Sequence, residues 1–253
     1  MRLARPDLVV DLGRIPGLAG ISERDGDLVF GAMTTKATVE RSELVRTRQP
    51  LLHAATRLIG HPQIRSRGTV GGSMAHADPA AEYPAVALAT DGWMRARSRR
   101  GERTIRAADF FVGALSTALA EDELLVEVGI PALKPGTGWA FTELPRRHGD
   151  FAMAGTAVTV DLDPEGCVAD ARIIVFGVES APARVSSAEA MLRGERPGAA
   201  VYSRAAGAVC DAIRNPLDDI HASGDYRRHL AGVLTERGLV DGVGRAVPQA
   251  VGS

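Results

Sequence analysis

The sequence predicts an α+β protein of two domains, and three observations support that prediction. The chain has 253 residues, which is enough for two ordinary domains, each with its own core. In the second half, strand-like segments come before helix-like segments, an order typical of α+β layers. The polar run 145–150 interrupts the hydrophobic periodicity. We therefore expect domains over residues 1–144 and 145–241, followed by a disordered tail over 242–253 that is rich in Gly, Pro and Ser.

The first domain is expected to combine short strands with helices. Strands are indicated by β-rich or alternating runs at residues 8–12, 28–30, 93–98, 104–106 and 124–130. The run 25–27, Asp-Gly-Asp, is a hairpin signal ahead of the second of these. Apolar residues at helical spacing predict a helix over 49–59. Another helix is expected over 79–89, because Asp78 suits an N-cap and Pro79 the first helical position.

The second domain shows the strands-then-helices order most clearly. A strand begins at 139–141, just before the expected boundary, and residues 157–162 alternate like a second strand. A turn at 163–166 leads into 168–178, the longest β-rich run in the chain. Two helices are expected over 199–214 and 225–238.

Composition narrows the classes of function. The formal net charge is −1, which gives no overall basic field for nucleic acid. Arginines gather in the hairpin 95–106, and we interpret them as a solvated face or a docking surface rather than a nucleic-acid site. Two distant cysteines indicate a reducing compartment and are too few for an iron–sulfur cluster. No apolar run reaches the ~20 residues of a membrane span, and nothing resembles a signal peptide, so we expect a cytoplasmic protein.

The run 69–73, Thr-Val-Gly-Gly-Ser, carries the most distinctive local pattern. Two glycines lack Cβ atoms, so a ligand can approach the backbone, and consecutive free amides in such a turn form an anion site. The flanking hydroxyls add donors. The competing interpretation is a tight turn, the commonest use of a glycine pair. The run is neither a Walker loop nor a Rossmann Gly-x-Gly-x-x-Gly turn.

A longer pattern extends this observation. Residues 63–80, Gln-Ile-Arg-Ser-Arg-Gly-Thr-Val-Gly-Gly-Ser-Met-Ala-His-Ala-Asp-Pro-Ala, resemble the second flavin loop of the FAD-binding medium subunits of molybdenum hydroxylases, of the carbon monoxide dehydrogenase and xanthine dehydrogenase type. The resemblance continues through 109–113, 123–131 and 146–152 in the same order. It implies a two-lobed, PCMH-type FAD-binding domain, followed by a smaller α+β domain with a three-stranded antiparallel sheet and helices.

The resemblance also implies a function. Electrons from the iron–sulfur clusters of a small partner subunit are expected to pass through FAD on this chain to an external acceptor. The molybdopterin and the [2Fe-2S] clusters are expected on a large and a small partner subunit, in a dimer of heterotrimers. Neither the substrate of the large subunit nor the electron acceptor follows from the sequence. Because the flavin supplies the redox chemistry, we expect no catalytic acid or base on this chain.

The cofactor-binding residues that the resemblance implies form a set of nine. They are Ile59, Gly68, Thr69, Gly71, Gly72, Ser73, Glu82, Leu125 and Thr142. From the residues alone, Ile59 and Leu125 are equally suited to core packing, and Glu82 to the first turn of a helix, where a carboxylate complements the helix dipole. Thr142 stands where some family members carry a lysine. A zinc site at His61, His76 and Asp78 lacks a recognised spacing, so we expect no metal site.

One departure from the family pattern concerns the start of the chain. The family carries a first flavin loop, Ala-Gly-Gly-His/Thr-Ser/Asp-Leu, before the strand equivalent to 8–11, and this sequence begins after it. The first lobe is therefore expected to be incomplete and the affinity for FAD reduced. Two alternatives remain open: a flavin-free scaffold that docks the partner subunits, or a simple nucleotide-binding module.

Overall fold

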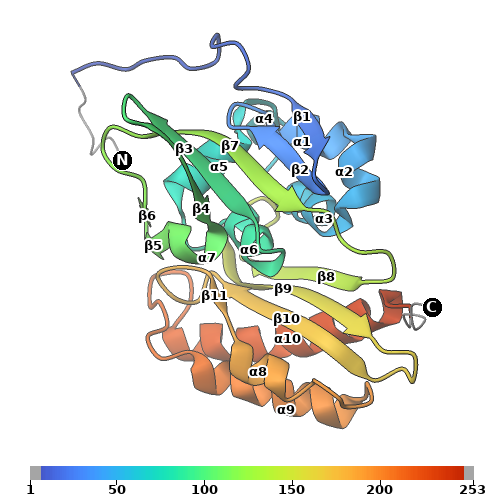
Figure 1. Ribbon diagram of the computed structural model, residues 1–253. Coiled ribbons are helices and arrows are strands. Elements are labelled where there is room, and N and C mark those ends of the chain that lie inside the picture. The colour runs from blue at the N-terminus through green and yellow to red at the C-terminus, as the bar shows by residue number, and fades with distance from the viewer. Residues whose placement is uncertain (1–6, 248–253) are drawn as a thin grey trace.

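Two α+β units share one interface in the computed structural model, which describes residues 7–247 (Figure 1). In the first unit, alternating apolar runs pair into a fully antiparallel sheet with the strand order β1-β2-β7-β3-β4. These strands are β1 (Ile21–Arg24), β2 (Asp27–Gly31), β7 (Leu124–Pro131), β3 (Trp93–Ser98) and β4 (Gly101–Arg106). The hairpin signal at 25–27 is confirmed, because Asp25 and Gly26 take the positive φ values that turn β1 into β2.

Helices fill the chain between β2 and β3. Thr35 and Ser42 cap the first two through their hydroxyls, and Pro50 and Pro62 open the next two at the position that proline favours. The helices of this unit are α1 (Lys36–Arg41), α2 (Glu43–Arg48), α3 (Pro50–Leu58), α4 (Pro62–Arg67), α5 (Val70–His76), α6 (Glu82–Ala89) and α7 (Ala107–Phe110). A short hairpin, β5 (Phe111–Gly113) and β6 (Ser116–Thr117), follows α7.

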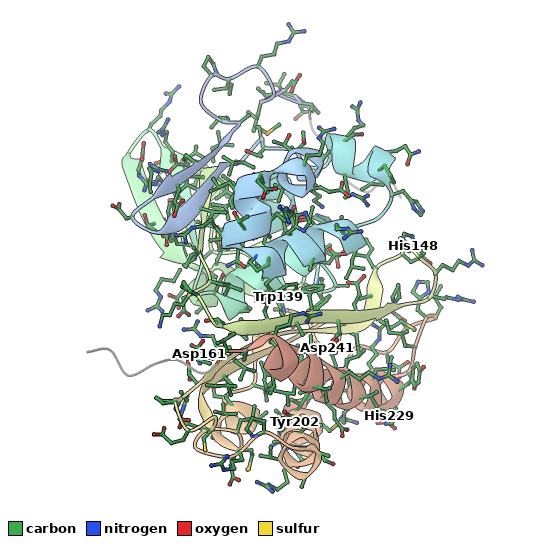
Figure 2. All side chains as sticks on the ribbon, turned by 90° about the vertical axis from the view of Figure 1, so that its right-hand side faces the viewer. Trp139, His148, Asp161, Tyr202, His229 and Asp241 are labelled. Atoms are coloured by element: carbon green, nitrogen blue, oxygen red, sulfur yellow. The ribbon has the colours of Figure 1, made fainter. Side chains whose placement is uncertain are left out.

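The second unit is a four-stranded antiparallel sheet, in the order β11-β10-β9-β8, with its helices on one face. Its strands are β8 (Gly138–Pro145), β9 (Ala152–Leu162), β10 (Val168–Phe176) and β11 (Ala183–Arg184). Its helices are α8 (Ser186–Ala190), α9 (Ala199–Ala212) and α10 (Gly224–Arg245). Figure 2 shows α10, which carries His229 and Asp241, running along the sheet beneath Trp139 of β8.

Both faces of this second sheet are buried, each in a different core. Val158, Val160 and Ile173 point to the core that α8, α9 and α10 cover. Ala157 and Phe176 point the other way, into the core of the first unit. This alternation is the period-2 pattern of a strand, and it explains why β9 and β10 are apolar on both faces. The sheet therefore fixes the first unit against the second.

Four expectations from the sequence need correction. Strand β8 pairs along its length with β9, so the expected boundary after residue 144 falls inside a strand of the second sheet; we propose that the boundary lies in the loop before Gly138. The sheet has four strands instead of three, because the two-residue β11 adds to its edge. Helix α10 continues to Arg245, inside the expected tail, and residues 248–253 lie outside the described residues. Residues 8–12 form no strand and are largely exposed.

The arginine-rich hairpin β3–β4 is balanced by acidic side chains. Arg97 pairs with Glu102 at 2.6 Å, Arg100 with Asp122 at 2.8 Å, and Arg103 with Glu123 at 2.6 Å. The first two pairs are exposed, whereas the Glu123 side chain in the third is 7% exposed, and together the pairs compensate part of the positive charge of the hairpin. Within residues 7–247, no helix has the length and apolar character that crossing a bilayer requires.

Candidate functional site

A cleft of about 660 Å³ opens between helices of the first unit and the loop that joins β8 to β9. Its size lies within the ~300–1,000 Å³ typical of ligand and cofactor sites. Backbone, polar side chains and apolar side chains all contribute to its lining. The lining residues are Met33, Lys36, Ile59, Gly60, Ile64, Arg67, Gly68, Thr69, Gly72, Ser73, His76, Asp78, Ala81, Glu82, Gly149, Asp150 and Phe151.

The glycine pair does not form the expected turn of free amides. Gly71 and Gly72 lie inside α5, which Thr69 caps. The amide of Val70 donates to the carbonyl of Thr34 at 2.9 Å, and the amide of Gly71 donates to the carbonyl of Ala32 at 2.8 Å. The amide of Gly72 donates to Thr69 Oγ1 at 3.1 Å. The predicted anion nest is therefore wrong in its conformation, because capping by Thr69 makes this run helical.

The two glycines have different surroundings. A Cβ on Gly71 would stand 2.5 Å from Ala32 Cβ and 2.8 Å from the Ala32 backbone, so α5 requires glycine to pack there. A Cβ on Gly72, which lines the cleft, would meet Thr69 Oγ1 at 2.7 Å and Thr69 Cβ at 4.0 Å. The absence of a side chain on Gly71 thus allows α5 to pack against Ala32. The absence of one on Gly72 leaves the backbone accessible at the cleft.

Hydrogen-bond donors for an anion nevertheless line the cleft. Between residues 68 and 73, the amide of Thr69 has no hydrogen-bond partner in the described part of the chain. Thr69 and Ser73, whose side chains carry hydroxyl groups, also line the cleft. Lys36 adds an ammonium group 5.6 Å from the centroid of the Tyr83 ring. Burial lowers the pKa of Lys36, while the carboxylate of Glu82 acts in the opposite direction.

Glu82 contributes an acidic group to the same wall. It lies in the first turn of α6, as expected, but the helix begins three residues later than predicted. Asp78 caps a turn instead, by accepting from the amide of Ala80 at 2.8 Å. Glu82 is 4% exposed, and burial raises its pKa to about 7, although its own backbone amide and Lys36 act against that rise.

Apolar side chains reach the cleft from both units. Ile59 is buried directly after α3, and Phe151, which is 61% exposed, directly precedes β9. Arg65 fixes the backbone here by donating to the carbonyls of Ile59 at 3.0 Å and Gly60 at 3.2 Å. The stacked rings of His61 and His148, 5.8 Å apart, join the two sides.

The donors and the apolar walls fit the two halves of a flavin dinucleotide. A diphosphate requires amide, hydroxyl and ammonium donors, which the segment 68–73 and Lys36 offer. A flat ring requires apolar faces, which Ile59 and Phe151 offer. Comparison with known proteins gives the same result. Residues 1–133 match the family described as the FAD binding domain in molybdopterin dehydrogenase, and residues 139–241 match the CO dehydrogenase flavoprotein C-terminal domain.

The chain belongs to this flavoprotein family. It is 40% identical to the 6-hydroxypseudooxynicotine dehydrogenase complex subunit alpha of Paenarthrobacter nicotinovorans, over 98% of this chain and 83% of that protein. It is 37% identical to the carbon monoxide dehydrogenase medium chain of Hydrogenophaga pseudoflava, over 94% of this chain and 83% of that protein. These relatives are dehydrogenase subunits, and this flavoprotein is an oxidoreductase subunit with FAD as its cofactor.

Solved structures agree with the fold of the flavoprotein. The carbon monoxide dehydrogenase of Hydrogenophaga pseudoflava that lacks the Mo-pyranopterin moiety superposes with a TM-score of 0.93 at 37% identity, covering 97% of this chain and 85% of that one. Quinoline 2-oxidoreductase from Pseudomonas putida 86 superposes with a TM-score of 0.91 at 33% identity, covering 96% and 84%. The expected two-domain α+β architecture of this family is confirmed.

The structure brings six of the nine expected site residues to the cleft. They are Ile59, Gly68, Thr69, Gly72, Ser73 and Glu82. Gly71 is buried within α5 and does not line the cleft. Leu125 is buried within β7, where it pairs with Ala96 of β3. Thr142 does not reach the cleft, because its hydroxyl bonds Thr156 Oγ1 at 2.7 Å and the carbonyl of Leu234 on α10 at 3.3 Å.

The sequence interpretation of the flavoprotein missed Lys36 and Phe151 as cleft residues. No local pattern marks Lys36, because helix α1 presents it to the cleft through a fold that the sequence alone does not give. Phe151 lies in the segment 146–152, which carries part of the family resemblance, and directly follows the polar run 145–150 at the expected domain boundary. A bulky aromatic residue directly after the polar run was a usable signal for a ligand contact.

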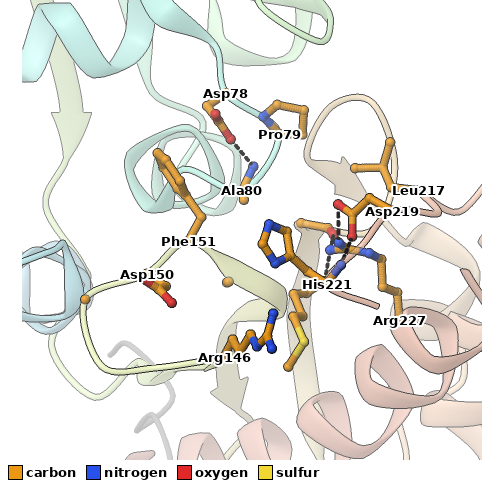
Figure 3. A pocket seen from close by; sticks show the side chains of 14 residues that line it. Asp78, Pro79, Ala80, Arg146, Asp150, Phe151, Leu217, Asp219, His221 and Arg227 are labelled. Atoms are coloured by element: carbon orange, nitrogen blue, oxygen red, sulfur yellow. Dashed lines mark hydrogen bonds and ion pairs between the residues drawn. The ribbon is translucent and has the colours of Figure 1, made fainter. Parts of the chain in front are cut away.

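A second cavity, of about 480 Å³, shares Asp78, Gly149, Asp150 and Phe151 with the cleft (Figure 3). Arg227 of α10 is 4% exposed on its wall. It donates to the carbonyls of Met153 at 2.6 Å and Gly177 at 2.8 Å, and to Asp219 Oδ2 at 2.7 Å. These bonds hold α10, the start of β9 and the end of β10 together. Within residues 7–247, no cluster of three His, Cys, Asp or Glu side chains is placed to hold a metal ion.

Proposed function

We propose that this flavoprotein passes electrons from the iron–sulfur clusters of a partner subunit, through FAD in the cleft, to an external acceptor. The observation that carries the proposal is a cleft whose lining combines the donors of 68–73 and Lys36 with the apolar side chains of Ile59 and Phe151. Bound flavin supplies the redox chemistry, because its ring accepts and returns electrons. The protein contributes binding, orientation and exclusion of water.

Each part of the cleft has a separate task in this proposal. Thr69, Ser73 and Lys36 hold the diphosphate, since hydroxyl, amide and ammonium donors satisfy its oxygens. Gly68 and Gly72 keep the backbone free of Cβ atoms where the diphosphate lies against it. Ile59 and Phe151 contact the ring, and Glu82 faces its polar neighbourhood. Gly71 and Leu125 are buried outside the cleft lining and act indirectly, through packing.

The complete reaction in this proposal requires partner subunits. Two cysteines on the chain, both free, are fewer than the about four thiolates that hold an iron–sulfur cluster. We therefore place the clusters on a small subunit and the molybdopterin on a large subunit, in a dimer of heterotrimers. Relatives are named as medium subunits or medium chains, which supports such an assembly. Free cysteines are typical of reducing compartments, which favours the cytoplasm.

The test is a pair of glycine variants in the complex purified with its partner subunits. Gly72→Val places a branched side chain at the cleft, and Gly207→Val places the same side chain on an exposed part of α9 with no atom within 4 Å. We expect Gly72→Val to lower FAD affinity at least about tenfold, equal to about 1.4 kcal/mol, and Gly207→Val to leave it unchanged. Titration with FAD, followed by flavin absorbance and fluorescence, measures both.

Two outcomes would contradict the proposal. Equal FAD affinity in both variants would show that the diphosphate does not bind at 68–73. Absence of flavin absorbance from the wild-type complex, even at saturating FAD, would favour the flavin-free scaffold. Circular dichroism of both variants checks that any loss of FAD does not come from unfolding.

A further inference from the structure

Lysine is rare in this chain, and one of its two lysines lies at the cleft. The sequence contains 28 arginines but only Lys36 and Lys134 as lysines. Lys134 is exposed in the loop before β8, whereas Lys36 opens α1 and lines the cleft. An ammonium group is a compact charge with three rotatable donors, which suits it to bind a phosphate oxygen.

Backbone contacts place Lys36 beside the segment 68–73. The amide of Lys36 donates to the carbonyl of Gly68 at 2.9 Å, and Thr35 forms a β-bridge with Thr69. A Cβ built on Gly68 would lie 3.4 Å from Cδ and 3.5 Å from Cε of Lys36, so the aliphatic part of the lysine passes along Gly68. Gly68 and Thr69 also line the cleft. Lys36 therefore adjoins the other donors that the cleft offers.

The ring of Tyr83 contacts the charged end of this lysine. The Nζ atom of Lys36 lies 5.6 Å from the centroid of that ring, within the ~6 Å typical of a cation–π contact. Tyr83 is fully buried in α6 and does not line the cleft. Any effect of the ring on a bound ligand must therefore pass through Lys36 or through the packing of α6.

A chain of hydrogen bonds holds the Tyr83 ring in place. Thr56 Oγ1 donates to the carbonyl of Leu52 at 2.7 Å, and the hydroxyl of Tyr83 lies 3.0 Å from Thr56 Oγ1. Because the hydrogen of Thr56 is used by Leu52, Tyr83 is the donor in the second bond. Thr56 and Tyr83 are both fully buried. The ring thus presents a face of fixed orientation to Lys36.

The ammonium group of Lys36 keeps its donors for a ligand. Among residues 7–247 it forms no ion pair within 4.0 Å and no hydrogen bond. Glu82, the residue before Tyr83, favours the charged form of Lys36, so its effect on the pKa of Lys36 opposes the lowering by burial. A cation that is held over an aromatic ring and lacks an anionic partner suits a phosphate oxygen.

We propose that Tyr83 positions Lys36 so that the cleft selects phosphorylated flavins over riboflavin, with Lys36 as the residue that binds the phosphate. This assignment rests on the proposed function, in which the cleft holds FAD. FAD carries a diphosphate, whereas riboflavin has the same ring and no phosphate. Lys36 gains a charge-assisted hydrogen bond from FAD alone. Tyr83 is a positioning residue, because it acts through Lys36.

The first test needs no flavin. Reductive methylation with ¹³C-labelled formaldehyde converts both lysines of the full chain to dimethyl-lysine and keeps their charge. In NMR spectra, we expect the N-methyl signal of Lys36 upfield of that of Lys134, because the ring current of Tyr83 shields it. Inorganic pyrophosphate should shift the Lys36 signal and leave the Lys134 signal in place. Lys36→Met and Lys134→Met assign the two signals.

Variants of Tyr83 check the origin of the upfield shift. Tyr83→Phe should keep the shift, since the ring remains, and Tyr83→Leu should remove it. If Tyr83→Leu does not fold, the shift in the wild type and in Tyr83→Phe decides the role of the ring. Coincident signals for the two lysines in the wild type would overturn the role of Tyr83. A Lys36 signal that does not respond to pyrophosphate would overturn the role of Lys36.

The second test uses the complex with its partner subunits, freed of flavin and titrated with FAD and with riboflavin by fluorescence. We expect Lys36→Met to lower FAD affinity at least about tenfold, as for a lost hydrogen bond to a charged group, and to leave riboflavin affinity unchanged. Tyr83→Leu should lower FAD affinity about fivefold, as for a lost cation–π contact, and Tyr83→Phe should retain wild-type affinity. Lys134→Met, in an exposed loop outside the cleft, is the matched control.

A double variant separates positioning from a general packing role. In the Lys36→Met background, Tyr83→Leu should cause no further loss of FAD affinity, because the residue that it positions is gone. A further fivefold loss there would overturn the role of Tyr83, and equal losses for FAD and riboflavin would overturn the selectivity. A wild-type complex that binds neither flavin would overturn the proposed function and the selectivity with it, while the response to pyrophosphate would still decide whether Lys36 binds phosphate.

Discussion

The amide of Gly71 donates a hydrogen bond to the carbonyl of Ala32 at 2.8 Å. Ala32 directly follows β2, so this bond holds helix α5 against the end of that strand. The approach is so close that a methyl group on Gly71 would stand 2.5 Å from Ala32 Cβ. The next glycine, Gly72, faces the cleft instead. Two adjacent glycines in one motif thus have separate tasks, one in the fold and one at the site.

Gly71→Ala should therefore destabilise the fold. The new methyl group collides with backbone as well as side-chain atoms of Ala32, and overpacking of this kind typically costs about 1–3 kcal/mol. Gly72→Ala is the control, because its methyl group meets one hydroxyl and alanine favours a helix by up to about 1 kcal/mol. Urea denaturation of both variants measures the free energy of unfolding. Equal stability of the two would contradict this division of tasks.

The stability of the protein should fall as the pH rises from about 5 to 8. The pKa values of Glu82 and Glu143 in the folded state, about 7 and about 8, lie above their ordinary value of 4.5. The folded state therefore binds more protons than the unfolded state in this range. The stabilisation is fully present below pH 4.5 and is lost as the pH rises through 7 and 8.

Glu143→Gln checks the origin of this pH dependence. The amide keeps the shape of the protonated carboxyl group but does not titrate, so the dependence on pH should become weaker in this variant. Denaturant unfolding at pH 5, 6, 7 and 8 compares it with wild type. Parallel curves for the two proteins would show that Glu143 ionises at its ordinary pKa.

Replacement of Arg65 by lysine should destabilise the fold. Its Nε and Nη2 donate to the carboxylate of Glu40 at 2.8 and 3.1 Å, while its Nη1 donates to the carbonyls of Ile59 and Gly60. An ammonium group cannot reproduce this planar fork, so Arg65→Lys should lower the free energy of unfolding by about 2–3 kcal/mol. It should also weaken FAD binding, because Ile59 and Gly60 line the cleft.

The exposed Arg57 of α3, which does not line the cleft, supplies the control for that substitution. It forms no ion pair among the described residues, and Arg57→Lys should change stability by no more than about 0.5 kcal/mol. Thermal unfolding and FAD titration of the two variants can be run side by side. If Arg65→Lys behaves like Arg57→Lys, the bonds of Arg65 to the cleft backbone contribute nothing measurable.

Arg227→Met should loosen the attachment of α10. The substitution removes bonds to the carbonyls of Met153 and Gly177, leaving them without those donors in a buried setting. We expect a loss of about 2–4 kcal/mol in the free energy of unfolding. Arg228→Met is the control, since Arg228 pairs with Asp225, whose side chain is 94% exposed. A smaller loss for Arg227→Met than for Arg228→Met in urea denaturation would contradict this role.

Much of the local structure could be predicted from short-range patterns. The spacing of Leu51, Leu52 and Ala55 predicted the helix that the structure shows as α3, and these side chains are buried as that spacing requires. The alternation in 124–130 predicted β7. The run 8–12 has the same β-rich character but forms no strand, because no neighbouring strand pairs with it in residues 7–247.

The sequence by itself determined the family, the two α+β units and six residues of the cleft, because motif order, hydrophobic period and turn residues are all local properties. Only the tertiary structure decided that the glycine pair is helical, that Thr142 faces α10, and that Lys36 and Phe151 line the cleft. It also decided the state of Glu143, since burial against α6 depends on segments far apart in the chain. Desolvation and close packing arise from such distant contacts, so a local sequence pattern cannot predict them.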